Sequence, residues 1–356
     1  MKVVLATIQT PFIHGGAEYL IRGLQHALGN SGHVVERVAM PFRFSPIDEV
    51  SRAMELWEGE DLTMINGHRA DLVICLQFPT YYLKHPAKAL WLLHQYRPFY
   101  DLWNTSFADD VKRQPGASLL RDRIIEKDTI HFTECAPRLT IAGTISARLQ
   151  RYNGISSSPV YHPPPMADRF YCAPPEAYVF VPSRLEETKR HELLIRAMAE
   201  VKTNINAIIC GDGGLSTRLE ALAEELEVHD HVKFVGKASE EEKLGLYAHS
   251  LCVFFGPYDE DYGYVTLEAM LSEKPVITCS DSGGPLEFVV HGETGLVVDP
   301  RPEEIARVID FLNSNRDQAV RMGQNGLDRY HELNVSWETV IDELTRAVTR
   351  EPALHS

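Results

Sequence analysis

Two glutamates eight positions apart carry the clearest chemical signal in the chain. Glu260 stands in an acidic loop after the apolar run LCVFFG, and Glu268 stands in the helical pattern that follows Gly263. A carboxylate can accept hydrogen bonds from a vicinal diol, as an acidic residue does for ribose in dinucleotide folds. The backbone amides of Tyr264 and Val265, in the first turn of that helix, can bind an anion. Either glutamate alone is more simply read as solvated, but the whole stretch favours a ligand with hydroxyl and phosphate groups.

Two cations follow another strand-like run. Arg184 and Lys189 flank the turn after AYVFVPS, directly before a helical pattern over 188–200. Two cations at the end of a strand and beside a helix start suit a diphosphate. Glu186 and Glu187 lie between them, so ordinary surface charge stays open as the alternative.

Glycines at strand ends give weaker signals. Gly15 and Gly16 in GGAE follow the first strand and would let a phosphate approach the backbone, although a tight turn is the simpler explanation. Gly211 in ICGDGG is a similar turn. The chain contains no G-x-G-x-x-G and no P-loop lysine, so neither a dinucleotide nor a triphosphate site is indicated. Backbone groups around Val235 to Lys237 are candidates for contacts to a base.

His94 follows the apolar run KALWLL and opens an aromatic, basic loop. A lone histidine is more often structural than functional, so both interpretations stay open. Tyr96, Arg97, Tyr100 and Trp103 could stack on sugar faces or pack against one another. His229 and His231 have no matching ligands nearby, so no metal site is expected.

Strands that alternate with helices must position these residues. Expected strands lie at 2–8, 33–40, 71–77, 88–95, 177–183, 205–211, 232–236, 251–256 and 275–280, and expected helices lie at 17–28, 188–200, 215–227, 239–249, 264–272 and within 302–349. This alternation predicts parallel sheets covered on both faces. The fold class is therefore α/β, with two tandem doubly wound Rossmann-like domains and an interdomain cleft.

The proline-rich segment 159–178 is the candidate linker, because proline interrupts helices and central strands. We expect an N-terminal domain over 1–170 and a C-terminal domain over 171–335. A C-terminal helix over 336–356 would cross back to the first domain. First-domain loops at roughly 41–66 and 96–128 would form an acceptor site.

Composition limits the partners. The 356 residues carry a net charge of −15, which disfavours nucleic acid as a partner. None of the six cysteines forms a C-x-x-C pair, and four lie in or beside apolar runs: Cys75, Cys210, Cys252 and Cys279. This indicates reduced, packed thiols and a cytoplasmic protein. The start MKVVLATIQT is too polar for a signal peptide, and no apolar run approaches the ~18 residues of a membrane span.

Together these motifs resemble the retaining glycosyltransferases of family four, which have the GT-B fold. The resemblance rests on GGAE, on SRLEETKRHELLIRAM (183–198), on ICGDGG and on Glu260 and Glu268 as an E-x7-E motif around Gly263. It implies metal-independent transfer of a hexose from a nucleotide-diphosphate sugar, such as GDP-mannose or a UDP-hexose, to a carbohydrate or lipid-linked acceptor in polysaccharide or glycan assembly. No cofactor is implied besides that co-substrate.

The resemblance also implies roles for single residues. Glu268 would hold the ribose, Glu260 would contact the donor sugar, and Arg184 and Lys189 would neutralise the diphosphate. His94 would lie near the sugar and the distal phosphate. The remaining implied donor residues are Gly211, Val235, Lys237, Gly263, Tyr264 and Val265, and Gly15 and Gly16 would line the acceptor side. Many members have glycine after the lysine where this chain has Arg190, which either alters the phosphate site or adds a cation.

Other interpretations stay open. A nucleotide-sugar 2-epimerase or a phosphorylase would share the architecture, and a non-catalytic nucleotide-sugar binding subunit would share the donor site. The donor's base and sugar, the acceptor, the oligomeric state and a peripheral contact with the inner face of a membrane are left undecided by the sequence.

Overall fold

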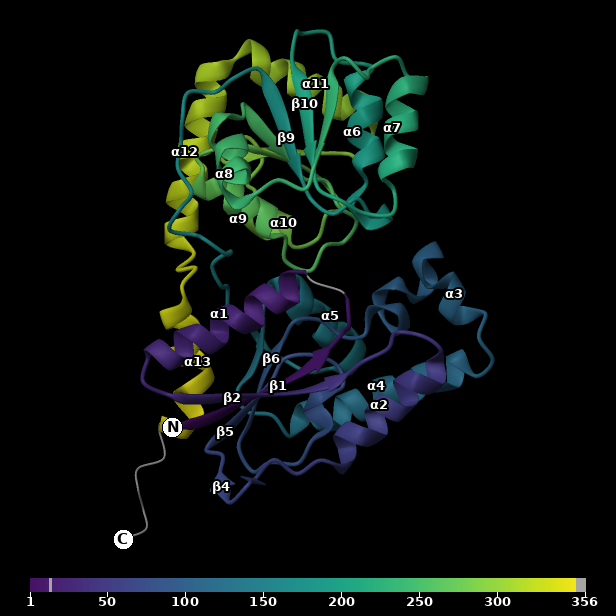
Figure 1. Ribbon diagram of the computed structural model, residues 1–356, viewed down its shortest axis with the longest axis vertical. Helices are drawn as coiled ribbons and strands as arrows, with labels where there is room; N and C mark the ends of the chain where they lie inside the picture. Colours follow the sequence, from purple (N-terminus) through teal and green to yellow (C-terminus); the bar gives the residue numbers. More distant parts are fainter. Residues whose placement is uncertain (13–14, 350–356) are drawn as a thin grey trace. The chain divides into compact units, whose positions relative to one another are not determined.

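The computed structural model describes residues 1–12 and 15–349 (Figure 1). The chain divides into two compact units. Unit 1 comprises Met1–His162 together with the chain from Val335 onward, and unit 2 comprises Pro163–Asn334. Each unit contains one six-stranded parallel sheet, as the alternation of strands and helices predicts.

The sheet of unit 1 has the order β2-β1-β5-β6-β7-β8. Its strands are β1 (Lys2–Gln9), β2 (Val34–Pro41), β5 (Leu72–Cys75), β6 (Lys88–Leu92), β7 (Arg138–Thr140) and β8 (Ser158–Pro159), and β3 (Met64–Ile65) and β4 (His68–Arg69) form a separate antiparallel pair. The apolar runs at 2–8, 71–77 and 88–95 supply β1, β5 and β6, whose central residues are fully buried. The strand order reverses direction between β1 and β5, as in flavodoxin-like sheets.

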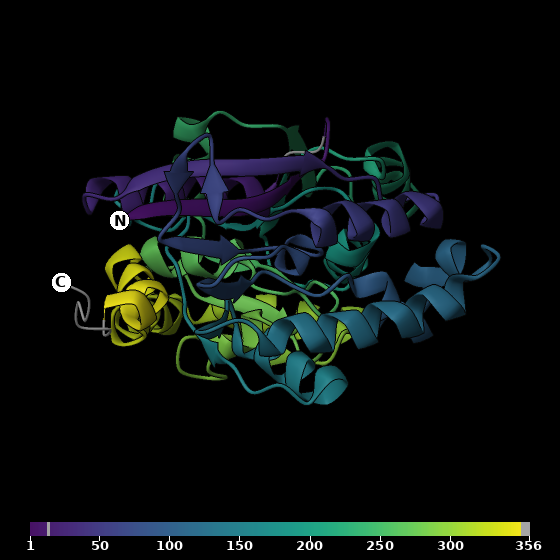
Figure 2. The ribbon, with the colours of Figure 1, turned by 90° about the horizontal axis from the view of Figure 1, so that it is seen from below.

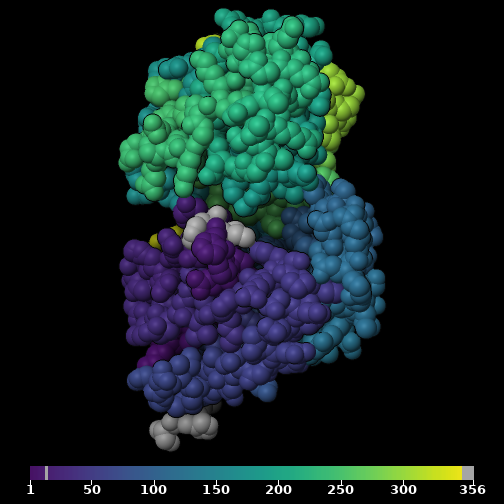
Figure 3. Space-filling model, turned by 45° about the vertical axis from the view of Figure 1, so that its right-hand side comes forward, coloured from purple at the N-terminus to yellow at the C-terminus, as the bar shows by residue number. Residues whose placement is uncertain are grey.

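Helices occupy most of the two segments of unit 1 that the sequence leaves as loops. The helices are α1 (Gly16–Asn30), α2 (Ile47–Gly59), α3 (Asp109–Lys112), α4 (Ala117–Thr133), α5 (Gly143–Asn153) and α13 (Trp337–Thr349), with short 3-10 turns η1 (Thr80–Tyr82), η2 (Arg97–Phe99), η3 (Asp101–Asn104) and η4 (Ser106–Ala108). The expectation of loops at 41–66 and 96–128 is therefore wrong over α2 and α4. These two helices lie side by side (Figures 1 and 2), where Arg123 reaches Glu55 and Lys127 reaches Glu58. The segment from η2 to α4 lies on the surface of unit 1, blue in Figure 3.

The C-terminal helix α13 packs within unit 1 against α1 and β5. The ring of Trp337 lies edge-on to the ring of Trp91, with centroids 6.3 Å apart. It also lies over Gly23 of α1, where an added Cβ would come within 2.3 Å of the Trp337 ring. Glycine at this position therefore allows α1 and α13 to approach each other closely.

The sheet of unit 2 has the order β11-β10-β9-β12-β13-β14. Its strands are β9 (Tyr178–Pro182), β10 (Asn206–Cys210), β11 (Val232–Gly236), β12 (Cys252–Phe254), β13 (Val276–Cys279) and β14 (Gly295–Val298). Counted along the unit this is the doubly wound order 3-2-1-4-5-6, and the order reverses between β9 and β12. In such sheets ligands bind outside the carboxyl ends of the strands at this switch point.

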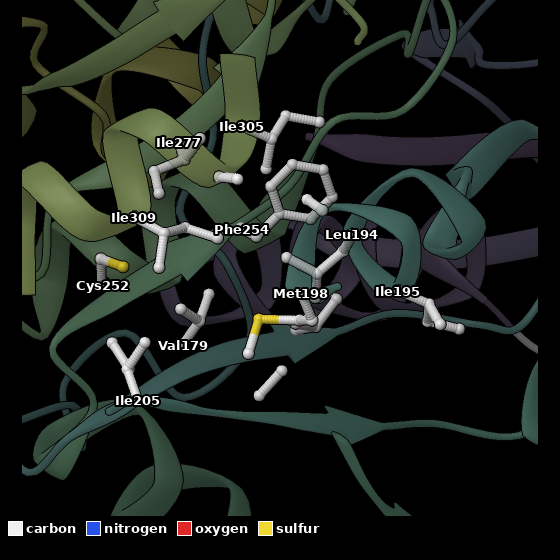
Figure 4. Close-up of a cluster of buried hydrophobic side chains, with 14 of the residues drawn as sticks. Val179, Leu194, Ile195, Met198, Ile205, Cys252, Phe254, Ile277, Ile305 and Ile309 are labelled. Atoms are coloured by element: carbon white, nitrogen blue, oxygen red, sulfur yellow. The ribbon is translucent and has the colours of Figure 1, made fainter. Parts of the chain in front are cut away.

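Helices cover both faces of this sheet, as the sequence predicts. They are α6 (His191–Met198), α7 (Ser216–Glu225), α8 (Glu240–His249), α9 (Tyr264–Leu271), α10 (Pro285–Phe288), α11 (Pro302–Ser314) and α12 (Arg316–Glu332), with a 3-10 turn η5 (Glu187–Lys189). Side chains of α6 and α11 gather with Val179 and Phe254 on one face (Figure 4), whereas α8 and α9 pack on the other. Ser239 caps α8 in a capping box with Glu242. No helix of the described residues is long and apolar enough to cross a membrane.

Candidate active site

The loops after β9 and β12 converge at the switch point of unit 2. The Tyr258 amide donates to the Thr188 carbonyl at 2.7 Å, and the Lys189 ammonium forms an ion pair with Glu260. The Lys189 and Glu260 side chains are 12% and 22% exposed, so the pair is largely shielded from solvent. The two stretches singled out in the sequence are thus neighbours, although 71 positions separate Lys189 from Glu260.

Arg190 fastens the same two loops. Its backbone is left-handed, with φ 52° and ψ 41°, a conformation that glycine adopts without cost. This conformation interrupts the helix expected over 188–200, which begins instead at His191. The guanidinium donates to the Gly256 carbonyl at 2.8 Å, to the Pro257 carbonyl at 2.6 Å and to both carboxylate oxygens of Asp281. The Arg190 guanidinium therefore connects these loops, and it supplies no unpaired cation to the site.

The turn after β13 supports the loop that carries Glu260. The Glu260 amide donates to the Ser282 carbonyl at 2.8 Å, and the Gly284 amide donates to the Glu260 carbonyl at 2.7 Å. Gly283 has φ 72°, and a Cβ there would lie 2.6 Å from the Glu260 carbonyl oxygen. Main-chain pairing on both sides therefore fixes the Glu260 backbone, and the Lys189 ion pair orients its side chain.

Helix α9 begins directly after this loop. Gly263 is left-handed with φ 83°, and a Cβ there would lie 2.8 Å from the Phe255 ring. Tyr264 and Val265 form the first turn and are partly buried. The predicted helix start after Gly263 is confirmed, and its amide end lies next to the Glu260 loop.

Glu268 is buried inside unit 2. It is 3% exposed, so its interpretation as a solvated helix residue is wrong. Lys243 donates to one carboxylate oxygen at 2.7 Å, and the Tyr247 hydroxyl donates to the other at 2.6 Å. Burial, with the Glu268 charge beside it, raises the pKa of Tyr247, which keeps this hydroxyl a donor. The Lys243 side chain is 30% exposed, so this network reaches the surface through the lysine.

Sequence reasoning missed Lys243 and Tyr247. They lie four positions apart on α8, so they share one helix face. The capping box at Ser239 marks where this helix starts. Their position on one helix face could have indicated that they act together. Nothing in the sequence, however, shows that this face packs against α9.

The other predicted residues of unit 2 lie along the same edge of the sheet. The Arg184 side chain is 48% exposed and pairs with Glu186 at 2.6 Å, so in this structure it is a surface charge. Gly211 follows β10, and a Cβ there would lie 2.0 Å from the Ser183 carbonyl oxygen. Val235 and Lys237, at the end of β11, are exposed.

The predicted residues His94, Gly15 and Gly16 lie in unit 1. His94 is partly buried just after β6, and its Nδ1 lies 2.7 Å from the Gln95 carbonyl oxygen. Gly15 is the N-cap of α1 and Gly16 is its first residue. Residues 13 and 14, next to them, lie outside the described residues.

The aromatic loop after His94 packs inward. The Tyr96 ring stacks on Phe78 with centroids 5.2 Å apart, and the Tyr100 hydroxyl donates to Asp128 at 2.6 Å. Both tyrosines are buried, so packing rather than sugar stacking describes them. Within residues 1–12 and 15–349, no three His, Cys, Asp or Glu side chains come together as metal ligands.

Comparisons with known proteins agree with this architecture. Residues 173–329 match the family model described as glycosyl transferases group 1. The mouse alpha-1,3/1,6-mannosyltransferase ALG2 is 33% identical over 37% of this chain and 31% of its own length. A GDP-mannose-dependent alpha-(1-6)-phosphatidylinositol monomannoside mannosyltransferase of Mycobacterium tuberculosis is 33% identical over 46% of this chain and 44% of its own length. The matches thus span less than half of these relatives.

The crystal structure of Anabaena Alr3699/HepE in complex with UDP and glucose superimposes with a TM-score of 0.71. It covers 98% of this chain and 99% of that chain at 16% identity, a level at which the likeness establishes the fold. The chain therefore has the GT-B fold of two Rossmann-like domains. The sequence similarity to glycosyl transferases group 1 covers residues 173–329, less than half of the chain.

Proposed function

We propose that this protein is a retaining, metal-independent glycosyltransferase. It moves a hexose from GDP-mannose or a UDP-hexose to a carbohydrate or lipid-linked acceptor in glycan or polysaccharide assembly. The observation that carries the proposal is the convergence of the Lys189 and Glu260 loops at the switch point of unit 2, beside the start of α9. The mannosyltransferase and UDP-bound relatives support a nucleotide-sugar donor.

The proposed roles follow from charge and hydrogen bonding. Breaking the sugar–phosphate bond places negative charge on the leaving diphosphate, and Lys189, Arg184 and the amides of Tyr264 and Val265 stabilise that charge. An ammonium has three donors, so Lys189 can hold Glu260 and still donate to a phosphate oxygen. Arg184, which is exposed, turns from Glu186 to the phosphate when the donor binds.

Hydroxyl groups are the proposed partners of the two acids. Glu268 accepts from the ribose through the lone pairs that Lys243 and Tyr247 leave unused, and Glu260 contacts the donor sugar. The base of the donor nucleotide lies near Val235, Lys237 and Gly211 in this proposal. His94 acts near the sugar and distal phosphate, and Gly15 and Gly16 line the acceptor side. The departing phosphate accepts the acceptor's proton in this scheme.

Replacing the cations tests the proposal. We expect Lys189→Ala and Arg184→Ala each to lower kcat by about 10²–10³-fold, the cost of removing one donor to a developing anion. The measurement is release of UDP or GDP from UDP-glucose or GDP-mannose, with and without a sugar acceptor, in chelator-containing buffer. Lys202→Ala, at an exposed lysine away from the site, should keep wild-type kcat.

Near-normal kcat in both cation variants would contradict the assignment. Conversion of the nucleotide sugar without an acceptor and without release of nucleotide would indicate an epimerase instead. Tight donor binding with neither transfer nor hydrolysis would indicate a binding subunit.

A further inference from the structure

A second chemically distinctive place in unit 2 lies at the opposite edge of the sheet from the candidate active site. Leu251 and Pro275 directly precede β12 and β13, so they mark the amino ends of these strands. Both line a surface hollow whose walls also include Pro174 and Val320. The walls are thus mostly apolar, yet the side chains of a cysteine and a lysine line the same hollow.

The cysteine is Cys172, in the segment before β9. All six cysteines of the chain are free thiols, and Cys172 is exposed whereas the other five are buried. Oxidants in solution therefore reach Cys172 far more readily than the other thiols.

The lysine is Lys274, in the turn between α9 and β13. It is 3% exposed, and its Nζ donates to the Ala173 carbonyl oxygen at 2.9 Å. The Cys172 thiol lies 3.8 Å from the same oxygen, so the Lys274 amine and the Cys172 thiol meet at one carbonyl group. The two side chains are thus held together although they are about a hundred positions apart in the chain.

Burial favours the reactive form of this lysine. Loss of solvent lowers the pKa of Lys274, while Cys172 and Glu273 partly oppose that shift. A lowered pKa increases the fraction of neutral amine, which is the nucleophilic form. A neutral amine beside an oxidisable thiol can capture the oxidised sulfur, as a backbone nitrogen does in a cyclic sulfenamide.

We propose that Cys172 and Lys274 form a covalent modification site for peroxide, at which oxidation joins the thiol sulfur to the lysine nitrogen. In the first step hydrogen peroxide oxidises the thiol to a sulfenic acid and is itself reduced to water. In the second step the Lys274 nitrogen attacks the sulfur, the S–O bond breaks, and a second water leaves with the proton that the nitrogen loses. The product is a sulfenamide, lighter than the reduced protein by two hydrogen atoms.

The cross-link would tie the segment before β9 to the turn that follows α9. Because this turn directly follows α9, which carries Glu268, the bond constrains the end of a helix that contributes to the candidate active site. The proposal itself concerns only the chemistry of the pair, and it stands whether or not the glycosyltransferase proposal holds.

Peptide mapping after oxidation tests the proposal. The full-length, reduced protein is treated with hydrogen peroxide, digested and analysed by mass spectrometry with and without the sulfenic-acid trap dimedone. In the wild type we expect the peptides of Cys172 and Lys274 as one species, lighter by two hydrogens than their sum and separated again by dithiothreitol. Lys274→Met should abolish this species and leave a Cys172 sulfenic acid that dimedone traps. Cys172→Ser should give neither product.

A second measurement needs no variant to fold. o-Phthalaldehyde condenses with an amine and a thiol that lie side by side and yields a fluorescent isoindole, so the wild type should form this adduct at Cys172 and Lys274. No joined peptide, with dimedone trapping at Cys172 equal to that in Lys274→Met, would overturn the proposal. Absence of the isoindole at this pair would overturn it as well.

Discussion

The charges of the two candidate acids are already balanced by protein partners. Glu260 is paired with Lys189, and Glu268 is held by Lys243 and Tyr247. Like charges repel, so an isolated carboxylate beside a diphosphate would weaken its binding. The two acids therefore present oxygen lone pairs to hydroxyl groups without opposing an anion nearby.

Arg190 provides a test of this scaffold. Arg190→Gly removes the left-handed strain, worth about 1–2 kcal/mol, but it also removes hydrogen bonds to Asp281, Gly256 and Pro257. Charge-assisted hydrogen bonds contribute about 1.5–3 kcal/mol each, so their loss outweighs the relief of strain and we expect a net loss of at least about 2 kcal/mol in the free energy of unfolding. The measurement is urea denaturation. Arg190→Lys keeps the charge but not the planar fork and should also destabilise. A glycine variant as stable as the wild type would contradict this net loss and would show that the Arg190 hydrogen bonds only offset the backbone strain.

At the same scale, the sequence predicted residue types better than their surroundings. Glu260, Lys189 and Gly263 could be identified as candidate site residues, because strand ends and helix starts can be predicted from local sequence patterns. The burial of Glu268 could not be found, because it depends on how α8 packs against α9. Arg190 could be recognised as a departure from the glycine that many family members have at this position. Its contact with Asp281 could not be predicted, because the two residues lie 91 positions apart.

Among the elements, most strands with long apolar runs were predicted, whereas several short strands and several helices were missed. The strands β1, β5, β6 and β9 are buried along most of their length and stand out as apolar runs. Three-residue β7 and two-residue β8 are too short for such a signal. Helix α4 buries the polar Asp128 among its core positions, which breaks the apolar periodicity that predicts a helix.

The packing of α13 on α1 gives a prediction for an element. A Cβ at Gly23 would overlap the Trp337 ring, so we expect Gly23→Ala to destabilise the protein by about 1–3 kcal/mol. Gly29 lies in the same helix, and a Cβ there meets nothing within 4 Å. Gly29→Ala should therefore be neutral or stabilise by about 0.5–1 kcal/mol, since alanine favours helices. Thermal denaturation of both variants checks this, and equal melting temperatures would contradict the close approach of the two helices.

For the molecule as a whole, one buried acid predicts a pH dependence of stability. Asp128 is fully buried and accepts hydrogen bonds from Tyr82 and Tyr100 at 2.6 Å each. Burial raises its pKa from 3.8 to about 7, against the opposing effect of the tyrosines. The folded state thus holds this proton more tightly than the unfolded state. The resulting stabilisation is complete below about pH 4 and is lost as the pH rises through about 7.

Asp128→Asn isolates this contribution, because asparagine is uncharged and of similar shape. The wild type should gain stability relative to the variant on going from pH 8 to pH 5, by on the order of 2 kcal/mol. Chemical denaturation at both pH values measures the difference. An unchanged or reversed difference would contradict a raised pKa at Asp128.

The central claim, a nucleoside-diphosphate site at the carboxyl edge of the unit 2 sheet, is tested most directly by ligand-induced thermal stabilisation. UDP, GDP, ADP, CDP and TDP, and then UDP-glucose and GDP-mannose, are added to the wild type, to Lys189→Gln and to Lys202→Gln as the matched control. A ligand at ~100 times its Kd adds about 2.7 kcal/mol of stability. We expect diphosphates and sugars of one base to raise the Tm of the wild type and of Lys202→Gln, and we expect this shift largely to disappear in Lys189→Gln. No shift with any of these ligands at millimolar concentration, or a full shift in Lys189→Gln, would contradict it.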